Sequence, residues 1–309
     1  MGPDVVHETY FSKTRMAPAD VPTVLTVYDM IHQRFPNMLS ANDKTSELKQ
    51  IAVELGSNDG AMLENFAKVG MRHLGVEPAA NVAAESEKHG VKAMVAFFSS
   101  GTPEKILAEH GPADTTSAAN VMCHIPDMTD IGRAVDILLK DTGVLIFEDP
   151  YLGDVIEKTS YDQTYDEHVF LFLAHSVSNI FGPHDLELID LIPQKTHGVS
   201  MRYILSQKEK YLISPEVAKI MAKEQTLGLT DPEKFDEFKE KCERSSHMLV
   251  EILEDLKAKG KRVVGYAATS KNTTVLNYYG IKPDLIEYIS DTTPIKLGKY
   301  TPGTHSCMH

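Results

Sequence analysis

The 309-residue chain has no tryptophan, only three cysteines, and no apolar run near the 18 residues that a membrane span needs. Cys123, Cys242 and Cys307 are too few and too scattered for a disulfide framework or a four-ligand zinc site, so we expect no bound metal. The N-terminus lacks the basic-then-apolar pattern of a signal segment. Together these absences favour a soluble protein in a reducing cytoplasm, without membrane partners.

Basic residues are also scarce. The 31 Lys and Arg residues against 44 Asp and Glu residues give a formal net charge of −13. A protein that binds polymeric nucleic acid needs a basic face to neutralise phosphates, so this class is disfavoured. A small anionic substrate needs only a local basic group and stays compatible with the composition.

From residue 50 onward, short apolar runs alternate with helical patterns, which predicts an α/β fold. The pattern favours a doubly wound parallel sheet with helices on both faces. The helices are expected at 61–69, 79–89, 103–110 and 130–140. The five strands are expected at KQIAVEL, HLGVE, VKAMV, TTSAANV and GVLIFED.

Two segments flank this alternation, and they set the predicted domain boundaries. Residues 1–48 form an N-terminal helical segment, because apolar residues recur at helical spacing from Val21 to Phe35. Residues 49–208 form the sheet domain, closed by LELIDLI and VSMRYIL as an antiparallel pair. Residues 209–309 are helical at first and then form a small, incomplete βαβ unit, whose last strand, LIEYISD, we expect to leave an open edge.

The stretch VELGSNDG, residues 53–60, indicates a ligand site at a strand–turn–helix junction. Glycine in such a turn lets backbone N–H groups and a helix N-terminus approach a ligand. Glu77 ends the next strand, 21 residues after Gly56, where a carboxylate commonly binds ribose hydroxyls. An adenosine-type ligand is therefore expected, with a plain βα turn as the alternative. A nicotinamide oxidoreductase is disfavoured because the turn lacks G-x-G-x-x-G.

VELGSNDG followed by GVEP resembles the S-adenosylmethionine site of class I methyltransferases. In order along the chain, LGSNDG, GVEPAANVA, NVMCHIPD, FEDPYLGD, YDQTYDEHVF, HGVSMR and GYAATSKNTTVLNYYGI resemble the sugar C-methyltransferases that act on nucleotide-linked keto-deoxysugars. The resemblance implies a class I methyltransferase Rossmann-like sheet, S-adenosylmethionine as cofactor and a nucleotide-diphosphate sugar as substrate.

The resemblance also implies residue roles where the motifs match. Those expected at the cofactor are Glu54, Gly56, Ser57, Asn58, Asp59, Gly60, Glu77 and Asn120, with Glu77 on the ribose. Those expected in substrate binding and proton removal are His124, Tyr165, Glu167 and His168. Those expected on the substrate side are Tyr10, His197, Ser200 and Arg202. Lys271, between a strand and a helix, is also expected there, bound to phosphate, with capping of the helix as the alternative.

Transfer of a methyl group to carbon requires removal of a proton next to a ketone. Histidine supplies a base near neutral pH, and a neighbouring carboxylate can orient it. A tyrosine hydroxyl could donate a hydrogen bond to the enolate oxygen. An O-methyltransferase, which needs no enolisable ketone, and a non-catalytic binding relative remain alternatives.

The chain departs from the family pattern in three places. It has no C-x-x-C, so the family's N-terminal zinc domain is not expected. Its substrate loop reads His197-Gly-Val-Ser200 where the family has H-G-G-S, and Val199 would narrow the loop. The chain stops at PGTHSCMH where relatives continue, so we expect a partner, such as a second copy in a homo-oligomer, or mobility at the open edge, or a shortened, inactive relative.

Overall fold

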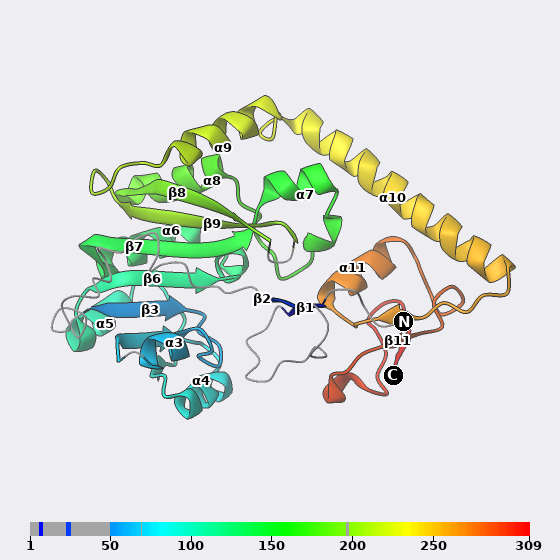
Figure 1. Ribbon diagram of the computed structural model, residues 1–309, viewed down its shortest axis with the longest axis horizontal. Helices are drawn as coiled ribbons and strands as arrows, with labels where there is room; N and C mark the ends of the chain where they lie inside the picture. Colours follow the sequence, from blue (N-terminus) through cyan, green and yellow to red (C-terminus); the bar gives the residue numbers. More distant parts are fainter. Residues whose placement is uncertain (1–5, 9–22, 26–49, 69, 196–197) are drawn as a thin grey trace. The chain divides into compact units, whose positions relative to one another are not determined.

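The computed structural model describes residues 6–8, 23–25, 50–68, 70–195 and 198–309 (Figure 1). The chain divides into two compact units. The first unit comprises Met1–Pro150 and Phe172–Ala222, and the second unit comprises Tyr151–Leu171 and Lys223–His309. Each unit is described by itself below.

A seven-stranded sheet forms the centre of the first unit, in the order β5-β4-β3-β6-β7-β9-β8. The strands from β5 to β7 run parallel, whereas β9 is antiparallel to both β7 and β8. The predictions of a doubly wound sheet and of an antiparallel closing pair are therefore confirmed. The strands are β3 (Ile51–Leu55), β4 (Arg72–Val76), β5 (Ala93–Met94), β6 (Ala113–Ala119), β7 (Leu139–Pro150), β8 (Leu186–Gln194) and β9 (Ser200–Gln207).

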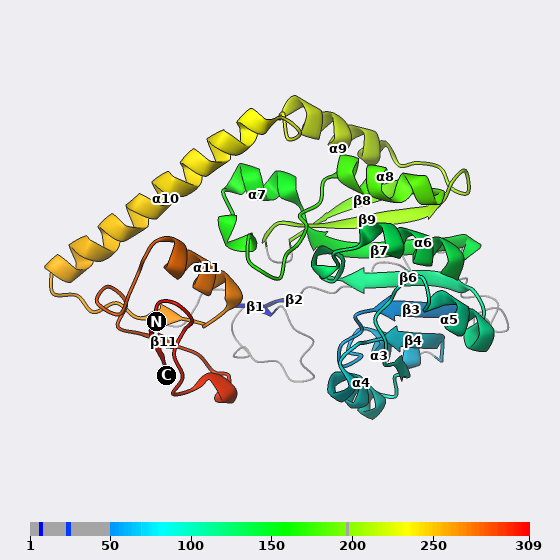
Figure 2. The same ribbon diagram turned by 180° about the vertical axis from the view of Figure 1, so that it is seen from behind.

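Helices cover both faces of this sheet, as Figures 1 and 2 show. On one face, Ala52 of β3 packs with Leu63 and Phe66 of α3. On the other face, Phe147 of β7 packs against Phe181 of α8, and their ring centroids lie 5.9 Å apart. The helices are α3 (Leu63–Lys68), α4 (Ala80–Ser86), α5 (Pro103–His110), α6 (Met128–Leu138) and α8 (Ala174–Phe181), with 3-10 turns η1 (Glu87–His89), η2 (Met122–His124) and η4 (Gly182–His184).

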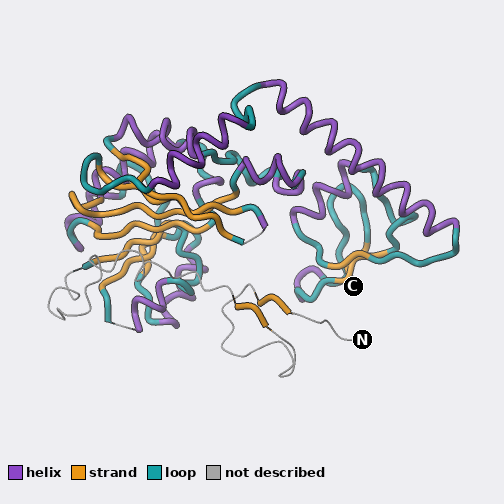
Figure 3. The backbone as a smooth tube through the Cα atoms, turned by 45° about the horizontal axis from the view of Figure 1, so that its top comes forward, coloured by secondary structure: helices purple, strands orange, loops and turns teal. Residues whose placement is uncertain are grey.

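The second unit combines helices with a small sheet (Figure 3). Its core joins Leu253 of α10 to Leu276, Ile281 and Ile289. The unit boundary falls within α9 (Pro215–Thr226). The other elements are α7 (Leu152–Lys158), η3 (Tyr161–Gln163), α10 (Pro232–Ala258), β10 (Gly265–Tyr266), α11 (Ser270–Tyr278), β11 (Tyr288–Ser290), η6 (Pro294–Lys296) and β12 (Cys307–Met308). Among the described residues no helix is both long and apolar enough to cross a bilayer.

The expected open edge after LIEYISD is wrong. The strand β11 pairs in parallel with β10 on one side and with β12 on the other. Cys307 and Met308 therefore supply the missing neighbour. A two-residue strand has no hydrophobic period, so the sequence pattern could not reveal it.

The predicted N-terminal helix is wrong where the structure can test it. Thr23–Leu25 forms strand β2, which pairs in parallel with β1 (Val6–Glu8). Thr and Val are β-branched and favour strands over helices. The rest of the 1–48 segment lies outside the described residues.

The domain boundary also differs from the prediction at residue 208. The first unit extends to Ala222, and Tyr151–Leu171 belongs to the second unit. The Tyr161 ring of η3 lies 5.6 Å from the Tyr279 ring after α11, and its hydroxyl lies 3.5 Å from Ser245 Oγ of α10. These contacts join residues that are distant in sequence, which composition cannot predict.

Candidate functional site

The turn after β3 adopts a conformation that requires glycine at two positions. Gly56 and Gly60 have φ angles of 61° and 79°, in the left-handed region. The Gly56 N–H donates to the Val76 carbonyl oxygen at 2.8 Å, which ties the turn to the end of β4. A Cβ on Gly56 would lie 2.6 Å from Val121 Cγ2. The turn therefore lies against the end of β6 with no room for a side chain at position 56.

Ser57 points into the first unit. Its side chain is buried against Gly75, where an added Cβ would lie 2.3 Å from Ser57 Oγ. This packing gives Ser57 a role in seating the turn on β4.

Glu77 connects the turn to the helix that follows β4. Its Oε2 accepts the Asn58 N–H at 3.0 Å, and its Oε1 accepts the Ala79 N–H at 2.9 Å. Each carboxylate oxygen has a second lone pair, so both can still accept a hydroxyl proton. The arrangement fits the expected ribose contact and also fixes the shape of the turn.

Glu54 is an acidic side chain buried at the end of β3. It is 5% exposed, and its Oε2 has no hydrogen-bond partner. Burial, reinforced by the nearby Asp59 charge, raises the pKa of Glu54 well above its usual range. An unpartnered buried carboxyl oxygen favours a ligand that donates hydrogen bonds, such as an ammonium group. Together with the close-approach turn, it fits the amino-acid end of S-adenosylmethionine.

The ends of β6 and β7 are held together by backbone and carboxylate contacts. Asn120 has a φ of 54°, and its N–H donates to the Glu148 carbonyl oxygen at 2.7 Å. The fully buried Asp149 accepts the Cys123 N–H at 3.3 Å. His124 is the last residue of this turn, η2, and is half-buried. The structure thus seats His124 at the carboxyl edge of the first-unit sheet.

Asp149, near the end of β7, was not among the expected site residues. Burial raises its pKa to about 7. The hydrogen bond from Cys123 N–H opposes this rise without cancelling it. Burial depends on packing, so sequence could not reveal the shift.

Arg202 and Ser200 lie on β9, facing the end of β7. Arg202 Nη2 and Nε lie 3.0 and 3.3 Å from Glu148 Oε2, in an ion pair buried on both sides. Ser200 is also buried. This arrangement favours a structural role for Arg202 over direct contact with a substrate.

In the second unit, the structure brings His168 and Tyr165 together. Their ring centroids lie 4.1 Å apart, and the backbone N–H of His168 donates to the Tyr165 carbonyl oxygen at 2.9 Å. His168 Nδ1 lies 2.8 Å from the Gln163 carbonyl oxygen. Because a carbonyl oxygen only accepts, this contact assigns the proton of the neutral imidazole to Nδ1 and the lone pair to Nε2. Glu167 is exposed on the turn before His168.

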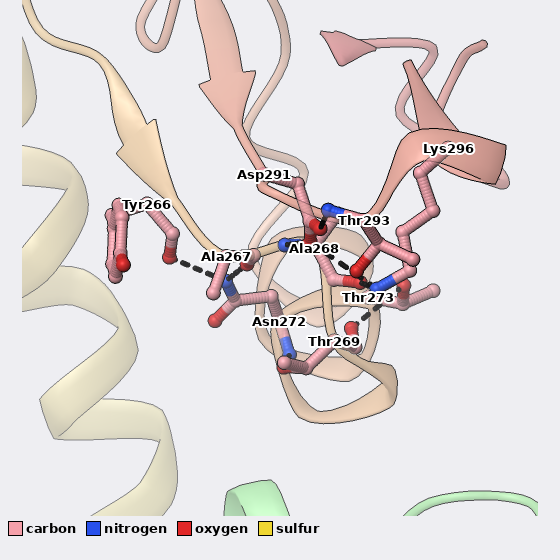
Figure 4. A network of polar contacts seen from close by, with 9 residues as sticks. All are labelled: Tyr266, Ala267, Ala268, Thr269, Asn272, Thr273, Asp291, Thr293 and Lys296. Carbon is pink, nitrogen blue, oxygen red and sulfur yellow. Dashed lines mark hydrogen bonds and ion pairs between the residues drawn. The ribbon is translucent and has the colours of Figure 1, made fainter. Parts of the chain in front are cut away.

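Lys271 is half-buried in the first turn of α11. Burial lowers its pKa, while the charge of Asp162 acts in the opposite direction. The loop before it is fixed by Asp291, which accepts the Ala268 N–H at 2.7 Å and the Thr293 N–H at 2.8 Å (Figure 4). These bonds hold the pKa of Asp291 well below its usual range. Figure 4 shows the other contacts of this loop. The Asn272 side chain donates to the carbonyl oxygens of Tyr266 and Ala267, and the Asn272 backbone N–H donates to the Thr269 hydroxyl. The Thr273 hydroxyl donates to the Thr269 carbonyl oxygen, and the Lys296 ammonium group donates to Asp291 and to the Ala268 carbonyl oxygen.

The expected site residues therefore fall into two groups, one in each unit. Tyr10 and His197 lie outside the described residues. The second-unit group is Tyr165, Glu167, His168 and Lys271. The first-unit group is Glu54, Gly56, Ser57, Asn58, Asp59, Gly60, Glu77, Asn120, His124, Ser200 and Arg202.

Comparison with known proteins gives two family matches in tandem. Residues 30–191 match a methyltransferase domain, and residues 195–309 match a C-methyltransferase C-terminal domain. The C-methyltransferase NovU of Streptomyces niveus is 32% identical over 255 residues, 82% of this chain. The chain spans 61% of the length of NovU.

Solved structures that resemble part of this chain include two methyltransferases. An S-adenosylmethionine-dependent methyltransferase from Anabaena variabilis is 12% identical, with a TM-score of 0.43 over 58% of this chain and 84% of that chain. One from Clostridium acetobutylicum is also 12% identical, with a TM-score of 0.41 over 57% and 97%.

The methyltransferase-domain match covers more than half of the chain, and it agrees with the sheet order and the glycine turn. The chain therefore belongs to the S-adenosylmethionine-dependent methyltransferase family, with a C-terminal domain of the C-methyltransferase type.

Proposed function

We propose that the protein transfers a methyl group from S-adenosylmethionine to a carbon atom of a nucleotide-activated keto-deoxysugar. The observation that carries this proposal is the 2.8 Å contact between His168 Nδ1 and the Gln163 carbonyl oxygen. Because a carbonyl oxygen only accepts, this contact assigns the proton of the neutral imidazole to Nδ1 and the lone pair to Nε2. A histidine fixed in this way can accept a proton. Methyl transfer to carbon requires that a proton be removed from a C–H bond, whereas methyl transfer to a hydroxyl does not.

The first-unit turn would hold the cofactor. Glu77 would bind the ribose hydroxyls, and Glu54 would accept from the amino group. Gly56 and Gly60 leave space for close approach. When bound, S-adenosylmethionine supplies an electrophilic methyl group with a neutral thioether as the leaving group.

Proton removal would be the work of the second-unit group. His168 Nε2 would take the proton from the carbon next to the sugar ketone, which leaves an enolate. The Tyr165 hydroxyl would donate a hydrogen bond to the enolate oxygen as charge develops there. The nucleophile is then the enolate carbon. His124, Glu167, Lys271, Tyr10 and His197 stay in the proposal as substrate-side residues, with His124 the second candidate for the base.

Three further predictions accompany this function. A cytoplasmic location follows from the scarcity of cysteine. A homo-oligomer is compatible with the sequence. The first unit is proposed to hold the cofactor, and the second unit is proposed to carry the base that acts on the sugar.

The experiment incubates the full chain with S-adenosylmethionine and a nucleotide-linked 4-keto-6-deoxysugar, and analyses the product by mass spectrometry and NMR. We expect a 14 Da mass increase and a new methyl resonance bonded to carbon. The matched control is the same sugar reduced at C4, which has no acidic C–H and should not react. An O-methyl resonance, or equal reaction of the reduced sugar, would contradict the proposal.

A further inference from the structure

The 3-10 turn η3 carries the contact that orients the proposed base. The Gln163 carbonyl oxygen, at the end of η3, lies 2.8 Å from His168 Nδ1. The Gln163 N–H donates to the Ser160 carbonyl oxygen at 3.1 Å, and Gln163 is buried. A backbone carbonyl group belongs to a planar peptide unit, so its direction follows the position of the turn. The orientation of His168 therefore depends on what holds η3 in place.

An aromatic cluster holds η3 against the end of α11. The ring centroid of Tyr161 lies 5.6 Å from that of Tyr279 and 6.4 Å from that of Tyr278. The Tyr278 and Tyr279 centroids lie 5.4 Å apart, and rings at these separations attract one another. The Tyr161 hydroxyl lies 3.5 Å from Ser245 Oγ on α10, which is long for a hydrogen bond. The ring of Tyr161, more than its hydroxyl, therefore anchors η3.

The next residue of η3 acts on the same helix. The charge of Asp162 acts on Lys271, in the first turn of α11. Lys271 and Tyr278 are seven residues apart, about two helical turns, so they share one face of α11. Two adjacent residues of η3 thus face two positions on one side of this helix.

The residue that joins α7 to η3 has an unusual backbone conformation. Thr159 has a φ of 56°, in the left-handed region, which β-branched residues rarely adopt. Such a conformation persists where the surrounding structure imposes it. The local chain does not favour this path into η3, so we infer that the contacts with α11 and α10 determine it.

We propose that Tyr161 is a positioning residue for proton removal. Its ring holds η3 on α11, so that the Gln163 carbonyl oxygen keeps the proton of His168 on Nδ1 and the lone pair on Nε2. Without this acceptor the neutral imidazole would divide between its two tautomers, and only one of them is a base at Nε2. The role in the reaction rests on the proposed function, whereas the tautomer of His168 can be measured without it.

The test records ¹⁵N NMR spectra of the full chain labelled at its histidine nitrogens, at about pH 8, above the usual histidine pKa of about 6.5. The His168 signals are those that disappear in His168→Asn. The parent should show a protonated Nδ1, and Tyr161→Ala should shift both signals toward a mixture of tautomers. Exchange of solvent deuterium into a nucleotide-linked keto-sugar should slow by about 10–100-fold, the scale of a misplaced catalytic group, with the KM changed less than about 3-fold. Tyr161→Phe keeps the ring and should restore both readouts.

Tyr288→Ala is the matched control. Tyr288 is also a half-buried tyrosine of the second unit, and its ring packs against His309 at a centroid distance of 4.9 Å. This variant should keep the parent's His168 signals and exchange rate. Thermal unfolding checks that each variant is folded. Tyr279→Leu, which removes the partner ring on the α11 side, repeats the test if Tyr161→Ala does not fold.

Unchanged His168 signals in Tyr161→Ala would overturn the inference, even if the exchange slowed, because Tyr161 would then act by another route. An equal shift in Tyr288→Ala would also overturn it, since both variants would then report a general loss of packing. A tautomer change in Tyr161→Ala, in a chain whose parent exchanges no proton, would support the anchoring of His168 and contradict the proposed function.

Discussion

The Glu77 carboxylate accepts hydrogen bonds from backbone N–H groups on both sides of the cofactor turn. Its 21-residue offset from Gly56 predicted a ribose contact, but the bonds to Asn58 and Ala79 could not be read from the sequence. They depend on where the chain returns after β4. The Glu77 side chain thus combines a proposed ligand contact with a structural role in the turn. Substitutions that remove all or only part of its hydrogen-bonding capacity can separate the two roles.

Glu77→Ala should weaken S-adenosylhomocysteine binding by about 10–150-fold, since hydrogen bonds to a charged group contribute about 1.5–3 kcal/mol. Glu77→Gln keeps one carbonyl acceptor and should lose less affinity for S-adenosylhomocysteine than Glu77→Ala. The measurement is calorimetry with S-adenosylhomocysteine. Glu85→Ala is the control, because Glu85 is an exposed acid on the neighbouring helix α4, where it pairs with Lys88. Equal affinity in Glu77→Ala and Glu85→Ala would remove Glu77 from the site.

Asp149 should make folding stability depend on pH. Burial raises its pKa to about 7 in the folded protein, whereas an unfolded Asp titrates near about 3.9. Between these values the folded chain holds a proton that the unfolded chain has released, so this group's contribution to stability falls as pH rises and levels off above about pH 7.

Asp149→Asn removes this titration and keeps an acceptor for the Cys123 N–H. Its stability relative to the parent should therefore increase from pH 5 to pH 8, by an amount on the order of 2–3 kcal/mol. Urea unfolding at pH 5, 6.5 and 8 measures it. Asp141→Asn, on an exposed part of β7, should show no such trend. A constant difference between Asp149→Asn and the parent across this range would show that Asp149 does not titrate there.

At the scale of elements, alternation of apolar runs and helical patterns predicted the parallel strands β3 to β7 and the helix Pro103–His110. Strand and helix periods are local properties, which explains this success. The failures involve long-range pairing. β12 has two residues and no period, and the Glu148–Arg202 pairing depends on the β7–β9 register. The helix predicted from Val21 to Phe35 is wrong at Thr23–Leu25, where strand pairing decides the conformation.

The turn after β3 can be tested with two glycines that share a left-handed φ. Gly70 has a φ of 77° and open space where a Cβ would be, whereas a Cβ on Gly56 meets Val121. Gly70→Ala should cost only backbone strain, about 1–2 kcal/mol. Gly56→Ala should cost about 1–3 kcal/mol more from overpacking, and should also weaken S-adenosylhomocysteine binding. Urea unfolding and calorimetry measure both. Matching losses in stability with unchanged binding would show that the turn tolerates a side chain.

The β7–β9 pair provides a second test at this scale. Arg202→Met leaves Glu148 buried without its cation and should destabilise the protein by about 3–5 kcal/mol. The double variant Glu148→Gln, Arg202→Met should recover part of this loss, because no uncompensated charge remains. Urea unfolding decides the point. If Arg202→Met kept full stability and raised only the KM for the sugar, Arg202 would be a substrate contact after all.

At the scale of the whole molecule, the chain carries its expected site residues in two compact units. The alternating strand and helix patterns predicted the α/β class, and the ordered motifs led to the methyltransferase family that the comparisons show. The unit boundary was missed because Tyr151–Leu171 joins the second unit through side-chain contacts such as Tyr161 with Ser245. The proposed base, His168, lies in this segment, and the proposed function depends on its role in proton removal.

The most direct test of that account is exchange of solvent deuterium into a nucleotide-linked keto-sugar, with S-adenosylhomocysteine in place of the methyl donor. This arrangement isolates proton transfer from methyl transfer. The parent should exchange the proton next to the ketone, and His168→Asn should exchange it about 10²–10⁴-fold more slowly, the range for a lost general base, while binding S-adenosylhomocysteine as the parent does. Glu167→Gln should slow the exchange by less than His168→Asn does. Exchange at the parent rate in His168→Asn would contradict the account and move the base to Tyr165 or His124.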